Sequence, residues 1–182
     1  PGAIANAARV LDRDSGVGAV GARVVLPNGM LQEAGSIVWN DGSCLGYARG
    51  RDPEDGTVMF RRDVDFCSGV FLMTRLALFK ETGGLDPVFA PAYYEETDYC
   101  LRLWERGLRV VYEPSVTVDH LEYGSSVKSG QALALMAANQ RVFFQKHAAA
   151  LARRHYPPRP ENIEAARSRG ARGRLLFIDD RV

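Results

Sequence analysis

Three carboxylates crowd the start of a predicted amphipathic helix near the middle of the chain. Residues 93–102 read YYEETDYCLR, so Glu95, Glu96 and Asp98 lie within four consecutive positions. Apolar residues follow at the i, i+3 and i+7 spacing of one helix face, at Leu101, Trp104 and Leu108. Acids are favoured at a helix N-terminus because the helix dipole and the free N–H groups attract negative charge. The chain is therefore expected to start a helix here, and acids kept ionised at its start suit a general base.

The same acids also have a purely structural interpretation. Thr97 or a neighbouring carboxylate can cap the helix, and Asp98 can pair with Arg102 one turn later. The residues alone favour this capping role over a catalytic one, so the assignment depends on the rest of the chain.

Composition indicates a globular protein and excludes several classes of function. Of the 182 residues, 46% are hydrophobic and 25% are charged, which suits one domain, or one domain with part of another. A net charge of +1 and a pI of 8.2 give no electrostatic case for nucleic acid. No apolar run reaches the roughly 18–20 residues of a membrane span, and no signal peptide is visible. Cys44, Cys67 and Cys100 show no CxxC spacing, so we expect free, buried thiols in a reducing compartment.

Glycines, prolines and apolar runs divide the chain into short α/β elements. The expected strands cover residues 22–26, 30–38, 64–74, 108–112 and 115–119. The expected helices cover residues 1–13, 75–82, the acidic segment up to 105 or 106, 127–154 and 161–169. Asn28 and Gly29 predict a tight turn between the first two strands, because both tolerate a positive φ. A long polar loop is expected over 40–63, and long loops often carry binding function.

Two further expectations concern pairs of residues. Ser68 and Gly69 lie in the middle of the strand expected over 64–74, where small residues let a ligand approach closely. His147 and His155 lie on or after the long helix, and we expect both at the surface.

The composition changes at residue 156. Residues 1–155 are expected to form one unit, and a solvated linker rich in proline and arginine begins at 156. The apolar run within 175–182 is typical of the first buried strand of a following α/β domain.

Three groups of residues, taken in order, resemble the C-terminal half of an inverting family 2 glycosyltransferase with a GT-A fold. The first group covers residues 18–23, 27–29 and 32–35, and the second covers 66–72 and 83–86. The third and most specific group covers 94–98, 100–102, Gly107, 110–114 and His120. The resemblance extends over about residues 1–147.

The resemblance implies a partial GT-A fold, an α/β arrangement with a mixed β-sheet flanked by helices and a C-terminal linker. The nucleotide-binding half, which ends in an Asp-x-Asp-like motif, is expected before Pro1. The parent enzyme would transfer a sugar from a nucleotide-sugar donor to a glycan or lipid-linked acceptor, with inversion, in cell-surface polysaccharide or glycoconjugate synthesis. It would need Mg²⁺ or Mn²⁺ and other domains of the same polypeptide, and would work in the cytoplasm or at the inner face of the membrane. The isolated chain is expected to be inactive.

The resemblance also assigns roles to residues. Glu96 matches the catalytic base, but Asp is commoner than Glu at that position, so Asp98 remains an alternative. His120 matches a metal ligand. Contacts with the acceptor or the sugar are expected from a further set: Glu95, Ser68, Gly69, Asp86 and Tyr94.

Two rival functions remain open. A degenerate GT-A domain could hold a glycan or a protein partner without catalysis, and an Asp-x-Asp motif upstream of Pro1 would argue against this. A nucleotidyltransferase shares the α/β class but needs a glycine-rich signature with a lysine, which this sequence lacks.

Overall fold

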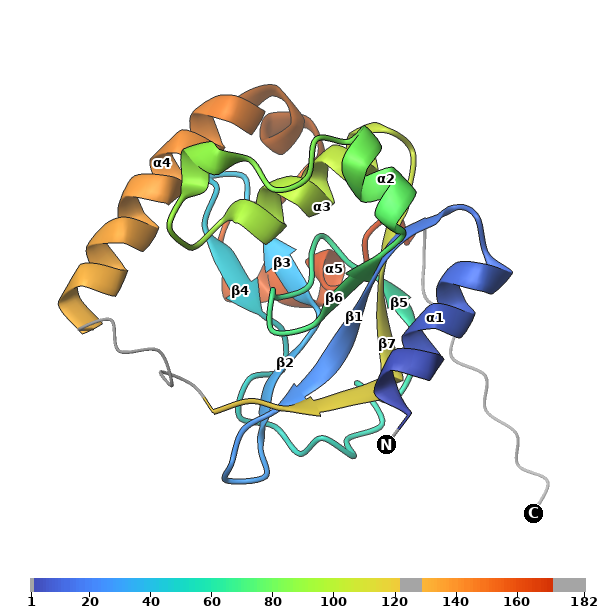
Figure 1. Ribbon diagram of the computed structural model, residues 1–182. Helices are drawn as coiled ribbons and strands as arrows, with labels where there is room; N and C mark the ends of the chain where they lie inside the picture. Colours follow the sequence, from blue (N-terminus) through green and yellow to red (C-terminus); the bar gives the residue numbers. More distant parts are fainter. Residues whose placement is uncertain (1, 122–128, 172–182) are drawn as a thin grey trace, which may run out of the picture.

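The chain folds around a curled, five-stranded mixed sheet flanked by helices (Figure 1). The computed structural model describes residues 2–121 and 129–171. The sheet has the order β2-β1-β7-β5, and β6 also pairs with β1. Its strands are β1 (Val17–Val25), β2 (Leu31–Ala34), β5 (Arg62–Asp63), β6 (Leu72–Thr74) and β7 (Arg109–Asp119). Two more strands, β3 (Ser36–Val38) and β4 (Cys44–Gly46), form a separate antiparallel pair.

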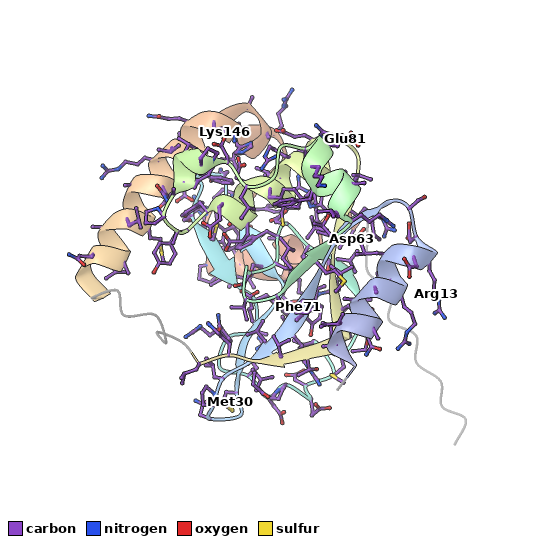
Figure 2. The ribbon with its side chains drawn as sticks, in the orientation of Figure 1. Arg13, Met30, Asp63, Phe71, Glu81 and Lys146 are labelled. Atoms are coloured by element: carbon purple, nitrogen blue, oxygen red, sulfur yellow. The ribbon has the colours of Figure 1, made fainter. Side chains whose placement is uncertain are left out.

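The central strand β1 organises the sheet. It pairs in parallel with β7 and antiparallel with β2 and β6. The β1–β2 connection is the predicted hairpin, with Gly29 at a φ of 81°, and Figure 2 shows Met30 at its tip, away from α2, α3 and α4. Gly21 faces Cys67 so closely that an added Cβ would lie 2.1 Å from the Cys67 Cβ. Only glycine therefore fits at this point of β1.

Helices cover both faces of the sheet. They are α1 (Ala3–Arg13), α2 (Leu76–Glu81), α3 (Glu95–Glu105), α4 (Ser129–Arg154) and α5 (Ile163–Ala166), with short 3₁₀ turns η1 (Pro87–Phe89) and η2 (Pro160–Asn162). One face of β1, including Val20 and Val24, packs on α1. The other face packs on α3 and the β3–β4 pair, and α4 lies outside α3 (Figure 1). Among the described residues, no helix is both long and apolar enough to span a membrane.

The mixed α/β class is confirmed, but the strand expected over 64–74 is wrong. Only Leu72–Thr74 forms a strand, because residues 68–71 make a tight turn. In that turn the Phe71 amide donates to the Ser68 carbonyl at 3.2 Å, and the Val70 amide donates to the Ser68 hydroxyl at 3.2 Å. Ser68 and Gly69 thus lie in a turn rather than within a strand.

The two strands expected on either side of Pro114 are one strand, β7. Its register against β1 shifts between Ala22 and Arg23, which pair with Glu113 and Thr117. The residues between Glu113 and Thr117 bulge out of the ladder, so Pro114 can stay within the strand although it has no N–H to donate.

The described part of the expected linker lies against the domain. The Arg169 amide donates to the Asp63 carbonyl at 2.8 Å, and the Arg169 guanidinium lies 4.7 Å from the centre of the Trp104 ring. Arg167 lies over the rings of Tyr47 and Phe60 at 5.3 and 5.6 Å. These two arginines are therefore largely buried rather than solvated. The strand expected within 175–182 lies outside the described residues.

Candidate active site

The acidic helix α3 begins after an unusual bend in the backbone. Tyr93 and Tyr94 have φ angles of 73° and 75°, in the left-handed region that non-glycine residues rarely adopt. Tyr94 is the N-cap residue and its side chain makes no capping hydrogen bond. The expected cap from Thr97 or an acid is therefore wrong, and the carboxylates of the first turn are left for other contacts.

A side chain of α4 holds this bend in place. The Asn139 amide nitrogen lies 2.9, 2.8 and 3.0 Å from the carbonyl oxygens of Phe89, Ala92 and Tyr93. Asn139 is only 5% exposed, so this amide group is committed to the loop that leads into α3. The position of the first acids thus depends on α4 as well as on α3.

Glu96 extends from this first turn towards the Ser68–Gly69 turn. A Cβ built on Gly69 would lie 3.9 to 4.0 Å from the Cβ, Cγ and Cδ atoms of Glu96. The Oε2 atom of Glu96 is buried and has no hydrogen-bond partner. Burial, followed by the charges of Glu95 and Glu33, raises the pKa of Glu96 to about 7, although the backbone amides of Glu96 and Gly69 oppose the shift. A carboxyl group with these properties can accept a proton near neutral pH.

Glu95, the residue before Glu96 in α3, borders a separate groove. It lines a groove of about 210 Å³ with the loop that precedes α3, including Leu85, Phe89 and Pro91. Its Oε2 atom is also without a partner. A groove that combines apolar walls with the two acids Glu95 and Asp86 suits a sugar ring, which offers both C–H faces and hydroxyl groups.

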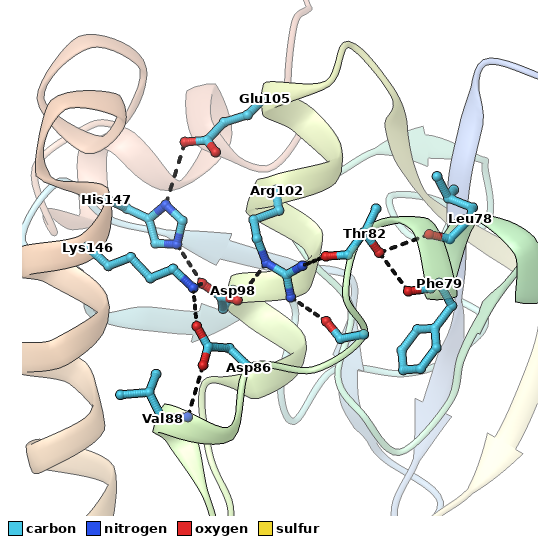
Figure 3. Close-up of polar contacts among 11 residues, drawn as sticks. Leu78, Phe79, Thr82, Asp86, Val88, Asp98, Arg102, Glu105, Lys146 and His147 are labelled. Carbon is cyan, nitrogen blue, oxygen red and sulfur yellow. Dashed lines mark hydrogen bonds and ion pairs between the residues drawn. The ribbon is translucent and has the colours of Figure 1, made fainter.

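Asp98 lies in a network of cations (Figure 3). Its side chain is fully buried and contacts Arg102 at 2.8 Å, Lys146 at 2.7 Å and His147 at 2.8 Å. Burial alone would raise the pKa of Asp98, but the hydrogen bonds from His147, Lys146 and Arg102 outweigh it and lower the pKa. The predicted pairing with Arg102 is present, and the network indicates a structural role for Asp98.

The expectation that His147 and His155 lie at the surface is wrong. The His147 side chain is 3% exposed and contacts Asp98, and its Nδ1 atom lies 3.6 Å from Glu105. The His155 side chain is 1% exposed, and its Nδ1–H donates to the Val38 carbonyl at 2.7 Å. Sequence reasoning missed these contacts because a lone histidine carries no signal of its buried partner.

Of the expected sugar-binding residues, Tyr94 serves the fold, whereas Asp86 lines the same groove as Glu95. The Tyr94 ring is buried and packs on Phe143 at 5.2 Å, and its hydroxyl donates to the Gly42 carbonyl at 3.0 Å. It therefore cannot offer its face to a sugar without leaving the core. Asp86 accepts a hydrogen bond from the Val88 amide at 3.0 Å and pairs with Lys146 at 2.7 Å.

Glu33 is a site residue whose role sequence reasoning missed. This acid of β2 is 6% exposed, and its Oε1 atom accepts a hydrogen bond from the Ser68 amide at 3.0 Å. Its Oε2 atom accepts one from the Ser36 hydroxyl at 2.9 Å. The available signal was its register, because Glu33 follows Leu31 by two residues and so shares the inward face of the strand.

His120 lies at the end of β7, beside β1 and β2. Its amide donates to the Val25 carbonyl at 2.8 Å, and its Nδ1 atom lies 2.7 Å from the Gln32 side-chain oxygen. Across residues 2–121 and 129–171, no group of three or more His, Cys, Asp or Glu side chains is arranged to hold a metal ion. The described residues therefore do not fit a complete metal site by themselves.

Comparison with known proteins leaves the family open. No known family model matches the chain, and no curated protein shows significant sequence similarity to it. The assignment below therefore depends on the geometry and on the motifs described above.

Proposed function

We propose that this chain is the acceptor side of an inverting glycosyltransferase and that Glu96 is its general base. One observation carries the proposal. Glu96 is a buried carboxyl group with a free oxygen, a pKa of about 7 and a small, glycine-lined turn opposite it. Acids with a strongly perturbed pKa are a general mark of catalytic sites.

In the proposed reaction the ionised Glu96 takes the proton of the acceptor hydroxyl. The hydroxyl oxygen forms a bond to the anomeric carbon as the bond from that carbon to the nucleotide phosphate breaks. The nucleoside diphosphate leaves with the electron pair, and the proton ends on Glu96. Glu95 would orient the acceptor from the adjoining groove.

Between the two acids that the motif left open, the surroundings favour Glu96. The Asp98 carboxylate is enclosed by Arg102, Lys146 and His147 and has a lowered pKa, so it is a weak base that no substrate can reach. The Glu96 carboxyl instead has a raised pKa and an oxygen atom without a hydrogen-bond partner. We assign donor binding and any metal-dependent step to the nucleotide-binding half of the parent polypeptide, to which His120 would contribute a single ligand from this side.

The test is Glu96→Gln in a polypeptide that carries this chain together with the nucleotide-binding half. Loss of the base should lower transfer by about 10²–10⁴-fold, because general base catalysis contributes that much, while donor binding stays unchanged. Glu105→Gln is the control, since that acid lies at the other end of α3 with a half-exposed side chain. Retained transfer by the Glu96 variant would move the base elsewhere.

The groove beside Glu95 also favours a second function, a glycan-binding module without catalysis. Its apolar walls and its two acids, Glu95 and Asp86, could hold a sugar even where no transfer occurs. Titration with oligosaccharides separates the two functions. A binding module should bind glycans and show no transfer in any polypeptide that contains a complete nucleotide-binding half.

A further inference from the structure

Glu33 connects two segments that lie far apart in the sequence. It belongs to β2, yet its carboxylate accepts hydrogen bonds from Ser36 beside it and from the amide of Ser68, at 2.9 and 3.0 Å. A buried carboxylate is costly unless such donors stabilise it. Its carboxylate thus holds the start of the Ser68 turn against the end of β2.

The Ser68–Gly69 turn also borders Glu96. Ser68 closes the turn through its carbonyl and hydroxyl, which accept hydrogen bonds from Phe71 and Val70. Gly69, the next residue, is the part of the turn that faces the Glu96 side chain, and its amide opposes the rise in the pKa of Glu96. A movement of Ser68 would therefore change the surroundings of the Glu96 carboxyl group.

We infer that Glu33 is a positioning residue for Glu96, acting through the Ser68–Gly69 turn and through its own negative charge. The inference rests on the proposed function in calling Glu96 the base, but the physical coupling can be measured without it. The alternative is a purely structural role, in which Glu33 only accepts hydrogen bonds from two buried donors.

The charges around the two acids set the direction of the coupling. Burial raises the pKa of Glu33, and the Ser68 amide, the Ser36 hydroxyl and the charge of Arg49 oppose the shift. Glu95 and Glu33 both raise the pKa of Glu96. The neighbouring Cys44 and Tyr94 are neutral near pH 7, because their pKa values are raised above ordinary values that already exceed 7. Removing the charge of Glu33 should therefore lower the pKa of Glu96.

The test is Glu33→Gln in this chain, followed by NMR titration of ¹³C-labelled glutamate carboxyl groups. Gln keeps an oxygen for the Ser68 amide and a donor for the Ser36 hydroxyl, so the turn should persist while the charge is lost. We expect the titration midpoint of Glu96 to move from about 7 part of the way towards its ordinary value of 4.5. In Glu33→Ala the amides of Ser68 and Gly69 should also exchange their hydrogens faster than in Glu33→Gln.

Glu113→Gln is the matched control. Glu113 is also 6% exposed and accepts a backbone hydrogen bond, from the Ser115 amide at 3.0 Å, but it pairs with Arg61 instead of touching the turn. An unmoved Glu96 midpoint in Glu33→Gln, or an equal shift in Glu113→Gln, would overturn the inference. If Glu33→Gln fails to fold, Ser36→Ala replaces it, because loss of that hydroxyl makes Glu33 harder to ionise and should shift Glu96 in the same direction.

The two proposals fail in different experiments. A shifted Glu96 midpoint together with unimpaired transfer by Glu96→Gln would keep the coupling and refute the proposed base. An unshifted midpoint together with lost transfer would keep the base and refute the coupling. With both correct, Glu33→Gln should move the acidic limb of the pH–rate profile to lower pH, and Glu113→Gln should leave it in place.

Discussion

At the scale of single residues, the same surroundings that make the Glu96 carboxylate a stronger base also lower the stability of the folded chain. A carboxyl group with the ordinary pKa of 4.5 is ionised at neutral pH but binds a proton weakly. Burial and the charge of Glu95 raise the pKa of Glu96 to about 7, where proton acceptance is most effective. The same surroundings make the ionised form unfavourable in the folded chain.

Replacing Glu96 should therefore stabilise the protein in alkaline but not in acidic solution. The folded chain holds this proton more tightly than the unfolded chain, so the stabilising contribution is present below pH 4.5 and is lost as the pH rises through about 7. At about pH 8, Glu96→Gln should raise the free energy of unfolding by about 1–3 kcal/mol, and at about pH 5 the gain should be small. Urea unfolding at both pH values measures this, with Glu105→Gln as the control, and equal stability at about pH 8 would contradict it.

At the scale of elements, α3 is fixed to α4 through Asp98. Its carboxylate joins Arg102 of α3 to Lys146 and His147 of α4, and Lys146 continues the network to Asp86 beside η1 (Figure 3). Arg102 also donates to the carbonyls of Thr82 and Gly84, at 2.7 and 2.5 Å, so the network reaches the end of α2. The acids at the start of α3 are thus held by three neighbouring segments.

Asp98→Asn should destabilise the chain by about 3 kcal/mol, because it leaves largely buried cations without their counter-charge. The pKa of Asp98 is lowered, so this contribution is present above pH 3.8 and is lost as the pH falls through the lowered pKa. Denaturant unfolding measures the loss. Glu81→Gln, which breaks the exposed pair with Arg106, should cost less than about 1 kcal/mol. A loss of similar size in both variants would show that the buried network contributes no more to stability than an exposed ion pair.

Elements with local signals could be predicted from the sequence. The first helix, the hairpin turn at Asn28 and Gly29, and the end of α3 before Gly107 all follow from nearby residues. The pairing of Asp98 with Arg102 follows from their spacing on one helix.

Features that depend on distant contacts could not be predicted. The turn at Ser68 requires Glu33, which lies 35 residues earlier, and the burial of His147 requires Asp98, 49 residues earlier. The continuity of β7 through Pro114 requires the bulge against β1. For the site, the sequence indicated Glu96 and Gly69 but not the hydrogen bond from the Ser68 amide to Glu33.

At the scale of the whole molecule, the segment after α4 closes the domain. Residues beyond His155 return to the loop over 40–63, where Arg167 covers Tyr47 and Phe60, and Arg169 pairs with Asp65. Ile163 and Ala166 pack on the main core. The structural unit thus extends past the boundary that the prolines indicate.

Truncation measures this extension. A chain that ends at residue 171 should unfold at the same temperature as the full chain, because all the described contacts remain. A chain that ends at 155 exposes Tyr47 and Trp104 and leaves Asp65 without Arg169, so its Tm should fall by roughly 5 °C or more. Calorimetry on both chains provides the comparison, and identical Tm values would mean that residues 156–171 are only loosely attached.

The bend at Tyr93 and Tyr94 has a consequence for the history of such chains. Two bulky residues in the left-handed region cost about 1–3 kcal/mol each, and Asn139 offsets part of that cost. Selection retains such strain only where the bent backbone is of use. In a lineage that no longer needed the acids, drift would replace the tyrosines with glycine or asparagine and release Asn139 to vary. Positions 93, 94 and 139 would then change together. The residues at these three positions would separate relatives that still use the acids from relatives that have lost their function.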